Sequence, residues 1–273
     1  MPGTAKVAIV TGAASGIGRV TAARLASLGY TLALADIDQR NLQAAEDELR
    51  ARGAHGLSVT TDVSDIAACR QLTDVVCARF GRIDVMVNSA GVVRPGTVDA
   101  VTDADVELEL RVNLFGVINA CRAVLPVMRR QASGHIVNIA SLAALVPLPG
   151  EAVYCASKYG VRGFSLALAL ELRRTPLRVS VVYPDSTETP MLQYEATHGG
   201  APLSFSGKIL RPDDIAAAVV HALQTGKREI AVPRSRGWLA LAGELVPALR
   251  DVLIEPLERL GVRELARRNR GGR

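Results

Sequence analysis

The sequence has few cysteines, and their spacing argues against a metal site. Four cysteines occur in 273 residues, and no two of them show the short paired spacing of metal ligands. They fall in segments that read as helices or as the ends of strands. We therefore expect reduced thiols and no metal at these positions, which are Cys69, Cys77, Cys121 and Cys155.

A long apolar run without charges is missing as well. A transmembrane helix needs about 20 apolar residues, and no uncharged run of about 18 occurs here. The apolar residues after Lys6 lead directly into a glycine loop and are too few for a secretory signal. The formal net charge is +5, and no nucleic-acid-binding motif accompanies the arginines near the C-terminus. These features predict a cytoplasmic protein that binds no nucleic acid.

Strand-like apolar runs alternate with helix-like segments of ten or more residues. This alternation indicates right-handed crossovers and a parallel sheet. Hydrophobic residues make up 49% of the chain, enough for a large core. We therefore expect an α/β fold, a single-domain doubly wound parallel sheet over residues 1–233. The expected strands are 6–10, 31–35, 56–60, 83–87, 135–139, 179–182 and 229–232.

A glycine-rich loop separates the first expected strand from the first helix. Strand, glycine loop and helix in this order form the first half of a dinucleotide-binding βαβ unit, as in the Rossmann fold. Glycines let the backbone approach a pyrophosphate, and the helix N-terminus offers free N–H groups to it. The predicted cofactor contacts in this loop are Gly12, Ser15, Gly16, Ile17 and Gly18.

An acidic residue, Asp36, ends the second expected strand, 24 residues after Gly12. A carboxylate at this place accepts hydrogen bonds from the ribose hydroxyls of adenosine and repels a 2′-phosphate. Ser15 and Ile37 supply no basic side chain for such a phosphate, so the sequence favours NAD over NADP. Arg40, one turn into the next helix, is the residue that speaks against this preference. The structural alternative for Asp36 is a helix N-cap.

A tyrosine and a lysine stand four residues apart in Tyr154-Cys-Ala-Ser-Lys158, so they share one face of a helix. A free phenol ionises near pH ~10, and a neighbouring cation favours the phenolate. The pair therefore indicates an acid/base catalyst. The alternative is a surface helix that carries both residues by chance.

With these elements, residues 5–233 resemble the short-chain dehydrogenase/reductase family. The resemblance rests on several motifs in the family's order: Thr11-Gly-x-x-x-Gly-Ile-Gly18, Asp62-Val63, Asn88-x-Ala-Gly91, Asn113, Ser141 and Tyr154-x-x-x-Lys158. It implies that Tyr154 exchanges a proton with the substrate oxygen and that Ser141 hydrogen-bonds this oxygen. It further implies that Lys158 lowers the Tyr154 pKa and holds the nicotinamide ribose, while Asn113 anchors a relay water. The cofactor contacts that it implies are Asp62, Val63, Asn88, Ala90, Gly91, Tyr154, Lys158, Pro184, Thr187 and Thr189.

The sequence departs from the family pattern where the family has Pro-Gly, because here Asp185 follows Pro184. Two interpretations stay open: the carboxylate reaches the mouth of the substrate pocket, or it caps the following turn. If the glycine normally supplies a positive φ, aspartate introduces strain. Segments expected to border the pocket are largely apolar, which suits a lipophilic ketone or secondary alcohol. The expected substrate contacts are Ser141, Leu142, Tyr154, Asp185 and Met191.

A helical, basic extension is expected over residues 234–273. Its apolar residues follow helical spacing interrupted by Pro247 and Pro256, and Arg259, Arg263 and Arg267 recur every four residues. Three placements stay open: packing on the same subunit, contribution to an oligomer interface, and contact with an anionic membrane surface. A homo-oligomer, dimer or tetramer, is expected from the resemblance.

The sequence thus predicts an NAD(H)-dependent oxidoreductase that transfers hydride between nicotinamide and the alcohol or carbonyl group of a lipophilic substrate. One alternative is a nucleotide-sugar epimerase, which shares the Tyr-Lys pair but needs a larger C-terminal domain. The other is a dinucleotide-binding regulatory or scaffold protein without catalysis.

Overall fold

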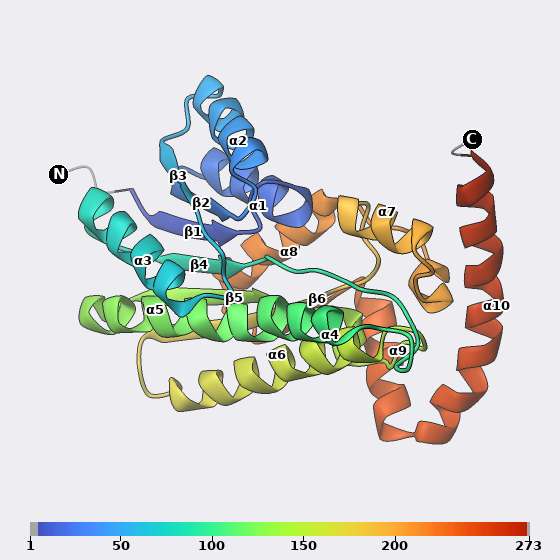
Figure 1. The fold of residues 1–273 in the computed structure, drawn as a ribbon. Helices are drawn as coiled ribbons and strands as arrows, with labels where there is room; N and C mark the ends of the chain where they lie inside the picture. Colours follow the sequence, from blue (N-terminus) through green and yellow to red (C-terminus); the bar gives the residue numbers. More distant parts are fainter. Residues whose placement is uncertain (1–4, 272–273) are drawn as a thin grey trace.

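The computed structural model describes residues 5–271 and contains the predicted sheet. Seven parallel strands follow the order β3-β2-β1-β4-β5-β6-β7 (Figure 1). Strands β2 and β3 add to one side of β1, and strands β4 to β7 add to its other side. The strands are β1 (Val7–Thr11), β2 (Thr31–Asp36), β3 (Gly56–Thr60), β4 (Val85–Asn88), β5 (Gly134–Ile139), β6 (Leu177–Pro184) and β7 (Glu229–Val232).

Helices cover both faces of the sheet, and alternate residues of β1 enter two separate cores. Val7 and Ile9 pack with one group of helices, whereas Ala8 and Val10 pack with the other. Burial on both faces explains why the strands read as continuous apolar runs. The first group is α3 (Ile66–Phe80), α5 (Gly116–Gln131) and α6 (Ala152–Glu171); the second is α1 (Gly16–Ser27), α2 (Gln39–Ala51) and α8 (Pro212–Thr225).

One continuous helix runs from α4 (Asp103–Glu109) through the π-helical turn η1 (Leu110–Phe115) into α5. Its length and hydropathy, taken alone, would allow it to cross a membrane. However, Val117, Val124 and Met128 are buried in the core on one side of the sheet. The helix is therefore a core element of this fold.

The C-terminal extension consists of α9 (Arg234–Leu245) and α10 (Pro247–Gly271), and it packs on the same chain. In Figure 1, α10 stands at the edge of the molecule, where it contacts α9, α7 (Pro190–Thr197) and the short helix η3 (Pro202–Phe205). Pro256 lies within α10, so the helix continues where the sequence predicts an interruption. Residues 272–273 of the predicted extension lie outside the described residues.

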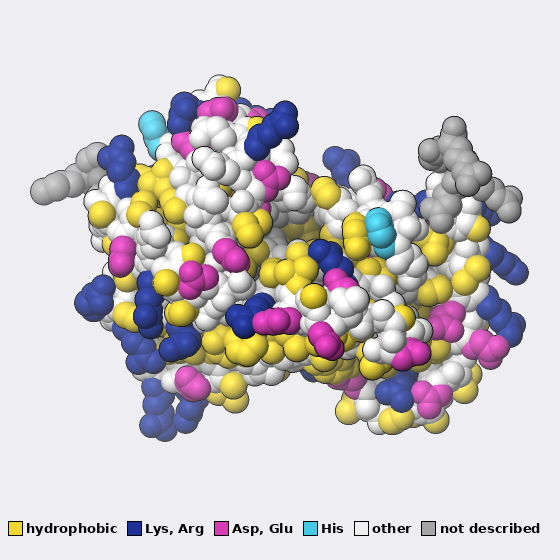
Figure 2. Space-filling view, viewed as in Figure 1, with side chains coloured by type: hydrophobic (Ala, Val, Ile, Leu, Met, Phe, Trp, Pro, Cys, Tyr) yellow, Lys and Arg dark blue, Asp and Glu magenta, His cyan; other side chains and the backbone are white. Residues whose placement is uncertain are grey.

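The predicted basic stripe on α10 is accompanied by acids. Arg259 pairs with Glu255, and Arg267 lies 3.7 Å from Glu264. Figure 2 accordingly shows basic and acidic side chains together along this edge. The exposed face of α10 is thus mixed in charge.

Candidate active site

The glycine loop lies at the carboxyl end of β1, between β1 and α1. Gly12 has φ +67° and Gly16 has φ +52°, conformations that side chains disfavour. A Cβ on Gly12 would lie 2.8 Å from the backbone nitrogen of Ala90 in the loop after β4. The two loops therefore approach closely at the point where strand order reverses, which is where doubly wound sheets bind ligands.

A cleft of about 500 Å³, here called the cofactor cleft, opens at this edge of the sheet. The loops after β1 to β4 and the start of α7 line it. The structure therefore brings together most of the predicted cofactor residues, namely Gly12, Ser15, Gly16, Ile17, Gly18, Asp36, Ile37, Asp62, Val63, Ala90, Gly91 and Thr189.

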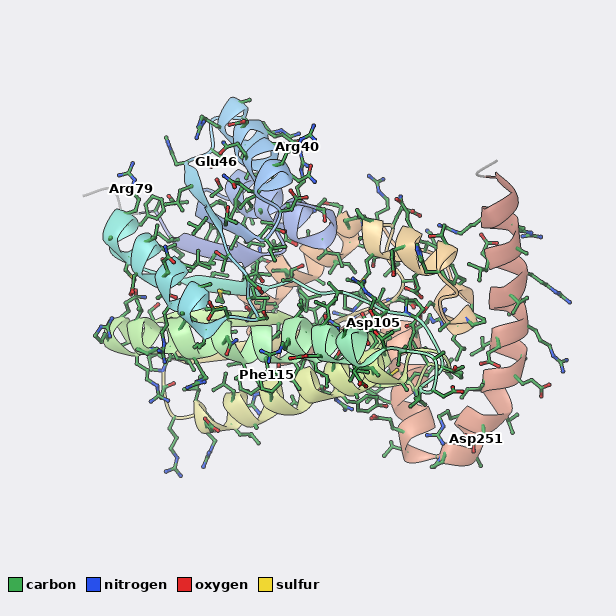
Figure 3. The ribbon with its side chains drawn as sticks, viewed as in Figure 1. Arg40, Glu46, Arg79, Asp105, Phe115 and Asp251 are labelled. Carbon is green, nitrogen blue, oxygen red and sulfur yellow. The ribbon has the colours of Figure 1, made fainter. Side chains whose placement is uncertain are left out.

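Asp36 lines the cleft and also links the loop after β1 to the loop after β2. Its carboxylate accepts hydrogen bonds from the N–H groups of Ala14 and Asp38, both at 3.0 Å. The N-cap of α2 is Asp38, which accepts from the N–H of Asn41, so the N-cap alternative for Asp36 is wrong. Arg40 lies on the exposed first turn of α2 (Figure 3).

Three predicted cofactor residues have side chains engaged elsewhere. Asn88 is 3% exposed, and its amide donates to the side-chain oxygen of Asn138, its register partner on β5. The Thr187 hydroxyl donates to the Asp185 carbonyl at 2.8 Å. Pro184 ends β6 and lines the second cavity described below. These residues shape the site through the backbone and the core.

The predicted catalytic residues come from three elements, and two of these, η1 and α6, meet beside Gly91. A Cβ on Gly91 would lie 3.3 Å from Asn113 Oδ1 and 3.6 Å from Lys158 Nζ. Lys158 follows Tyr154 by one turn of α6, with Nζ 5.5 Å from the Tyr154 ring centroid. Ser141, just after β5, lies close enough to Tyr154 for its hydroxyl to lower the Tyr154 pKa.

Asn113 occupies the π-helical turn η1 and is fully buried. Its Oδ1 accepts from the N–H of Val92 at 2.8 Å, and its Nδ2 donates to the Val92 carbonyl at 2.9 Å and to Ser157 Oγ at 3.1 Å. Single π-helical turns inside an α-helix often occur at functional sites. Asn113 thus fixes the loop after β4 against α6.

The electrostatics of the pair differ from the sequence expectation. Burial raises the pKa of Tyr154, and the charge of the Glu151 carboxylate raises it further. The Ser141 hydroxyl lowers this pKa and so opposes both effects. Burial also lowers the pKa of Lys158 to about 8, and Glu109 opposes this shift. Desolvation of both groups therefore outweighs the lowering of the Tyr154 pKa that the sequence predicts.

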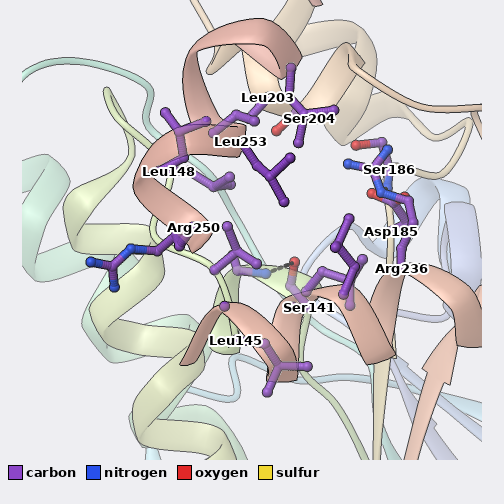
Figure 4. Close-up of a pocket in the computed structure, with 18 of the residues that line it drawn as sticks. Ser141, Leu145, Leu148, Asp185, Ser186, Leu203, Ser204, Arg236, Arg250 and Leu253 are labelled. Atoms are coloured by element: carbon purple, nitrogen blue, oxygen red, sulfur yellow. Dashed lines mark hydrogen bonds and ion pairs between the residues drawn. The ribbon is translucent and has the colours of Figure 1, made fainter. Parts of the chain in front are cut away.

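A second cavity of about 100 Å³, here called the substrate cavity, has Ser141 at one end (Figure 4). Leucines from three regions of the chain form much of its wall. The extension supplies one side of the cavity, through α9 and α10. The apolar lining residues are Leu142, Leu145, Val146, Leu148, Leu203, Leu239, Leu253, Ile254 and Leu257.

Asp185 lines the substrate cavity beside Arg236 of α9, as Figure 4 shows. Its Oδ2 lies 3.0 Å from Arg236 Nε, and its Oδ1 accepts from the N–H of Ser186. Both sequence interpretations therefore hold in part. Among the described residues, Ala132 is the only non-glycine residue with a positive φ, so the strain considered for Asp185 does not occur.

Met191 was predicted as a substrate contact. In the structure it lines the cofactor cleft and is not among the residues that line the substrate cavity. Sequence reasoning missed Arg236, which carries no motif, and Leu253, whose only signal was the apolar spacing of the extension. It also missed the buried acids Glu109, Glu151 and Glu195, which carry no motif.

Comparisons with known proteins agree with this geometry. The sequence model described as short chain dehydrogenase matches residues 6–199. The chain is 38% identical over 229 residues to 2,3-dihydro-2,3-dihydroxybenzoate dehydrogenase of Bacillus subtilis, covering 79% of this chain and 87% of that protein. It is 40% identical over 220 residues to D-threitol dehydrogenase of Mycolicibacterium smegmatis, covering 79% and 84%.

Solved structures with the same fold include two with bound nicotinamide cofactors. A short-chain dehydrogenase/reductase from Burkholderia phymatum in complex with NAD has a TM-score of 0.78, 30% identity, and coverage of 90% of this chain and 92% of that one. A variant of actinorhodin polyketide ketoreductase with NADPH also has a TM-score of 0.78, with 32% identity and coverage of 84% and 95%. Matched over most of its length, with its glycine-loop motif lining the cofactor cleft, the chain belongs to the short-chain dehydrogenase/reductase family and is an NAD(P)-dependent oxidoreductase.

Proposed function

We propose that this enzyme uses NAD(H) to interconvert a lipophilic secondary alcohol and the corresponding ketone. The observation that carries the proposal is the position of Ser141, which lies beside Tyr154 and also lines an apolar cavity. A carbonyl oxygen bound at this end of the cavity would meet the Ser141 hydroxyl, with Tyr154 behind it, while the rest of the substrate would meet leucines.

In ketone reduction, Tyr154 donates its proton to the carbonyl oxygen, and Ser141 holds this oxygen by a hydrogen bond. In alcohol oxidation, Tyr154 accepts the proton. The bound nicotinamide supplies or accepts the hydride. Lys158 holds the nicotinamide ribose and supplies positive charge beside Tyr154, and Asn113 anchors the water that passes protons to solvent. These roles follow the family pattern, and the proximity of Asn113 and Lys158 to Gly91 supports them.

The preference for NAD rests on Asp36. Its carboxylate lines the cofactor cleft and is held by Ala14 and Asp38, so it cannot turn away from a 2′-phosphate without losing two hydrogen bonds. Titration with NADH and NADPH tests this preference. We expect NADH to bind more tightly to the wild-type enzyme, and Asp36→Ser to reduce the preference by roughly tenfold or more. Asp38→Asn, on the exposed cap, is the matched control, and tighter NADPH binding by the wild type would contradict the proposal.

The lipophilic substrate is supported by the wall of the substrate cavity. A screen of hydrophobic secondary alcohols and ketones with the preferred cofactor tests it. Turnover of apolar substrates over polyols is the expected result. Tight NADH binding without turnover on the whole panel would favour the non-catalytic alternative.

We further propose that the enzyme is a cytoplasmic homo-oligomer, a dimer or tetramer. Phe115 is 52% exposed and Trp238 is 73% exposed, and a second copy would cover such apolar surface. Light scattering after size-exclusion chromatography tests the oligomeric state, and a monomer at micromolar concentration would contradict it.

A further inference from the structure

Two buried glutamates meet beside the catalytic helix and have no role in the mechanism above. Glu151 immediately precedes α6, three residues before Tyr154, and is 3% exposed; Glu195 lies in α7 and is 7% exposed. The charge of Glu195 raises the pKa of Glu151, and Glu195 Oε1 is buried with no hydrogen-bond partner among the described residues. Within residues 5–271, no lysine or arginine charge lowers the pKa of either carboxylate.

The other contacts of this pair lead to residues 190–206, here called the lid, which comprise α7, η3 and the turn between them. Glu151 Oε1 accepts a hydrogen bond from the N–H of Ala201 at 2.9 Å. Glu195 is itself part of the lid, on α7, and Ala201 immediately precedes η3. The acid pair thus connects the amino end of α6 with both helices of the lid.

The lid contributes to both binding sites. Met191 lines the cofactor cleft, and Leu203 lines the substrate cavity. Gly200 packs directly against the Glu195 side chain, so the turn between α7 and η3 is built on that side chain. A shift of the lid away from α6 would therefore open both sites together.

Two ionised carboxylates in contact inside a protein repel each other, and one shared proton removes the repulsion. Burial raises the pKa of Glu151 to about 9 and also raises the pKa of Glu195. The other titratable groups that act on this pair or feel its charge are Tyr154 and Cys155 on α6 and Glu109 on α4. All of these groups are acids, so none of them supplies a compensating cation.

We propose that Glu151 and Glu195 are positioning residues that hold the lid on α6 by sharing one proton. With the proton in place, one carboxyl donates to the other, and Glu151 still accepts from Ala201. Without it, the contact becomes a repulsion between like charges at the place where the lid meets the catalytic helix. The inference rests on the geometry of the lid and holds for either cofactor and any substrate.

Hydrogen exchange of the lid amides in the full-length protein, corrected for intrinsic rates, tests this proposal between pH 6 and 10. The pKa of Glu151 is raised from its ordinary 4.5 to about 9. The stabilisation of the closed lid by the shared proton is therefore complete below pH 4.5 and is lost as the pH rises through about 9. We expect the protection of Ala201 to fall by up to about tenfold per pH unit between pH 6 and 9.

Glutamine variants separate titration from packing. Glu151→Gln imitates the protonated acid, since its amide donates to Glu195 and its carbonyl accepts from Ala201. This variant and the double variant Glu151→Gln/Glu195→Gln should keep the lid protected to pH 10. Glu171→Gln, at the exposed far end of α6, should behave like the wild type.

Wild-type protection that does not change with pH would overturn the proposal. So would a double variant that loses protection over the same pH range as the wild type. Since the readout needs neither turnover nor cofactor, such a result would leave the proposed function untouched.

Discussion

Asp185 Oδ2 lies 3.0 Å from Arg236 Nε, and this ion pair joins the end of β6 to the first turn of α9. The Asp185 side chain is only 9% exposed, so its charge depends on the arginine. Arg236 also donates to Ser206 Oγ at 2.9 Å. The pair thus fixes the extension where it forms one wall of the substrate cavity.

Removal of the arginine should destabilise the fold. Arg236→Gln leaves the Asp185 carboxylate buried without its cation, which we expect to lower the free energy of unfolding by about 3 kcal/mol. Urea unfolding measures this change. Arg234→Gln, on the exposed side of the same turn, is the control and should change stability by less than ~0.5 kcal/mol. Equal effects of the two variants would show that the ion pair carries no stability.

A larger side chain at Leu253 should block the substrate cavity. Leu253 lines the cavity from α10, so Leu253→Trp fills space that the substrate needs. We expect kcat/KM for a lipophilic substrate to fall by at least about tenfold, with unchanged NADH affinity. The control is Leu260→Trp, because Leu260 lies on the same helix but is 51% exposed. If both variants retain wild-type kinetics, α10 does not contact the substrate.

The buried Lys158 should reduce stability at neutral pH. Its pKa is lowered from 10.5 to about 8, so the folded state binds fewer protons than the unfolded chain between these values. Lys158 therefore costs no stability above pH 10.5. The cost of burying its charge grows as the pH falls and is complete below about pH 8. We expect Lys158→Met to be inactive, yet more stable at pH 7 by about 3 kcal/mol.

This advantage of Lys158→Met should shrink between pH 8 and 10.5. Denaturant unfolding across that range measures it, with Lys208→Met at an exposed position as control. A Lys158→Met enzyme that is less stable than the wild type at pH 7 would show that Lys158 stabilises the fold.

The sequence predicted the sheet well because buried parallel strands leave an unambiguous apolar pattern. The glycines at 12, 16 and 18 and the acid at 36 follow strands directly, so their meeting at one edge could be inferred from chain order alone. The i, i+4 relation of Tyr154 and Lys158 is likewise local.

Contacts between distant residues could not be predicted in this way. Asn88 faces the core because parallel pairing places it opposite Asn138, 50 residues later. Glu151 and Ala201 are also 50 residues apart, and their contact depends on how the lid packs. The pKa of Tyr154 depends on its burial, which the Tyr-x-x-x-Lys pattern does not contain.

Tyr154→Phe shows whether Tyr154 is the acid/base of a hydride-transfer reaction. Turnover of the best substrate from the screen and the Kd of NADH are measured for this variant and for Tyr159→Phe, a control on the more exposed side of α6. We expect Tyr154→Phe to lose roughly 100-fold or more in kcat while its NADH affinity changes little, and Tyr159→Phe to remain active. Wild-type turnover by Tyr154→Phe would contradict the account.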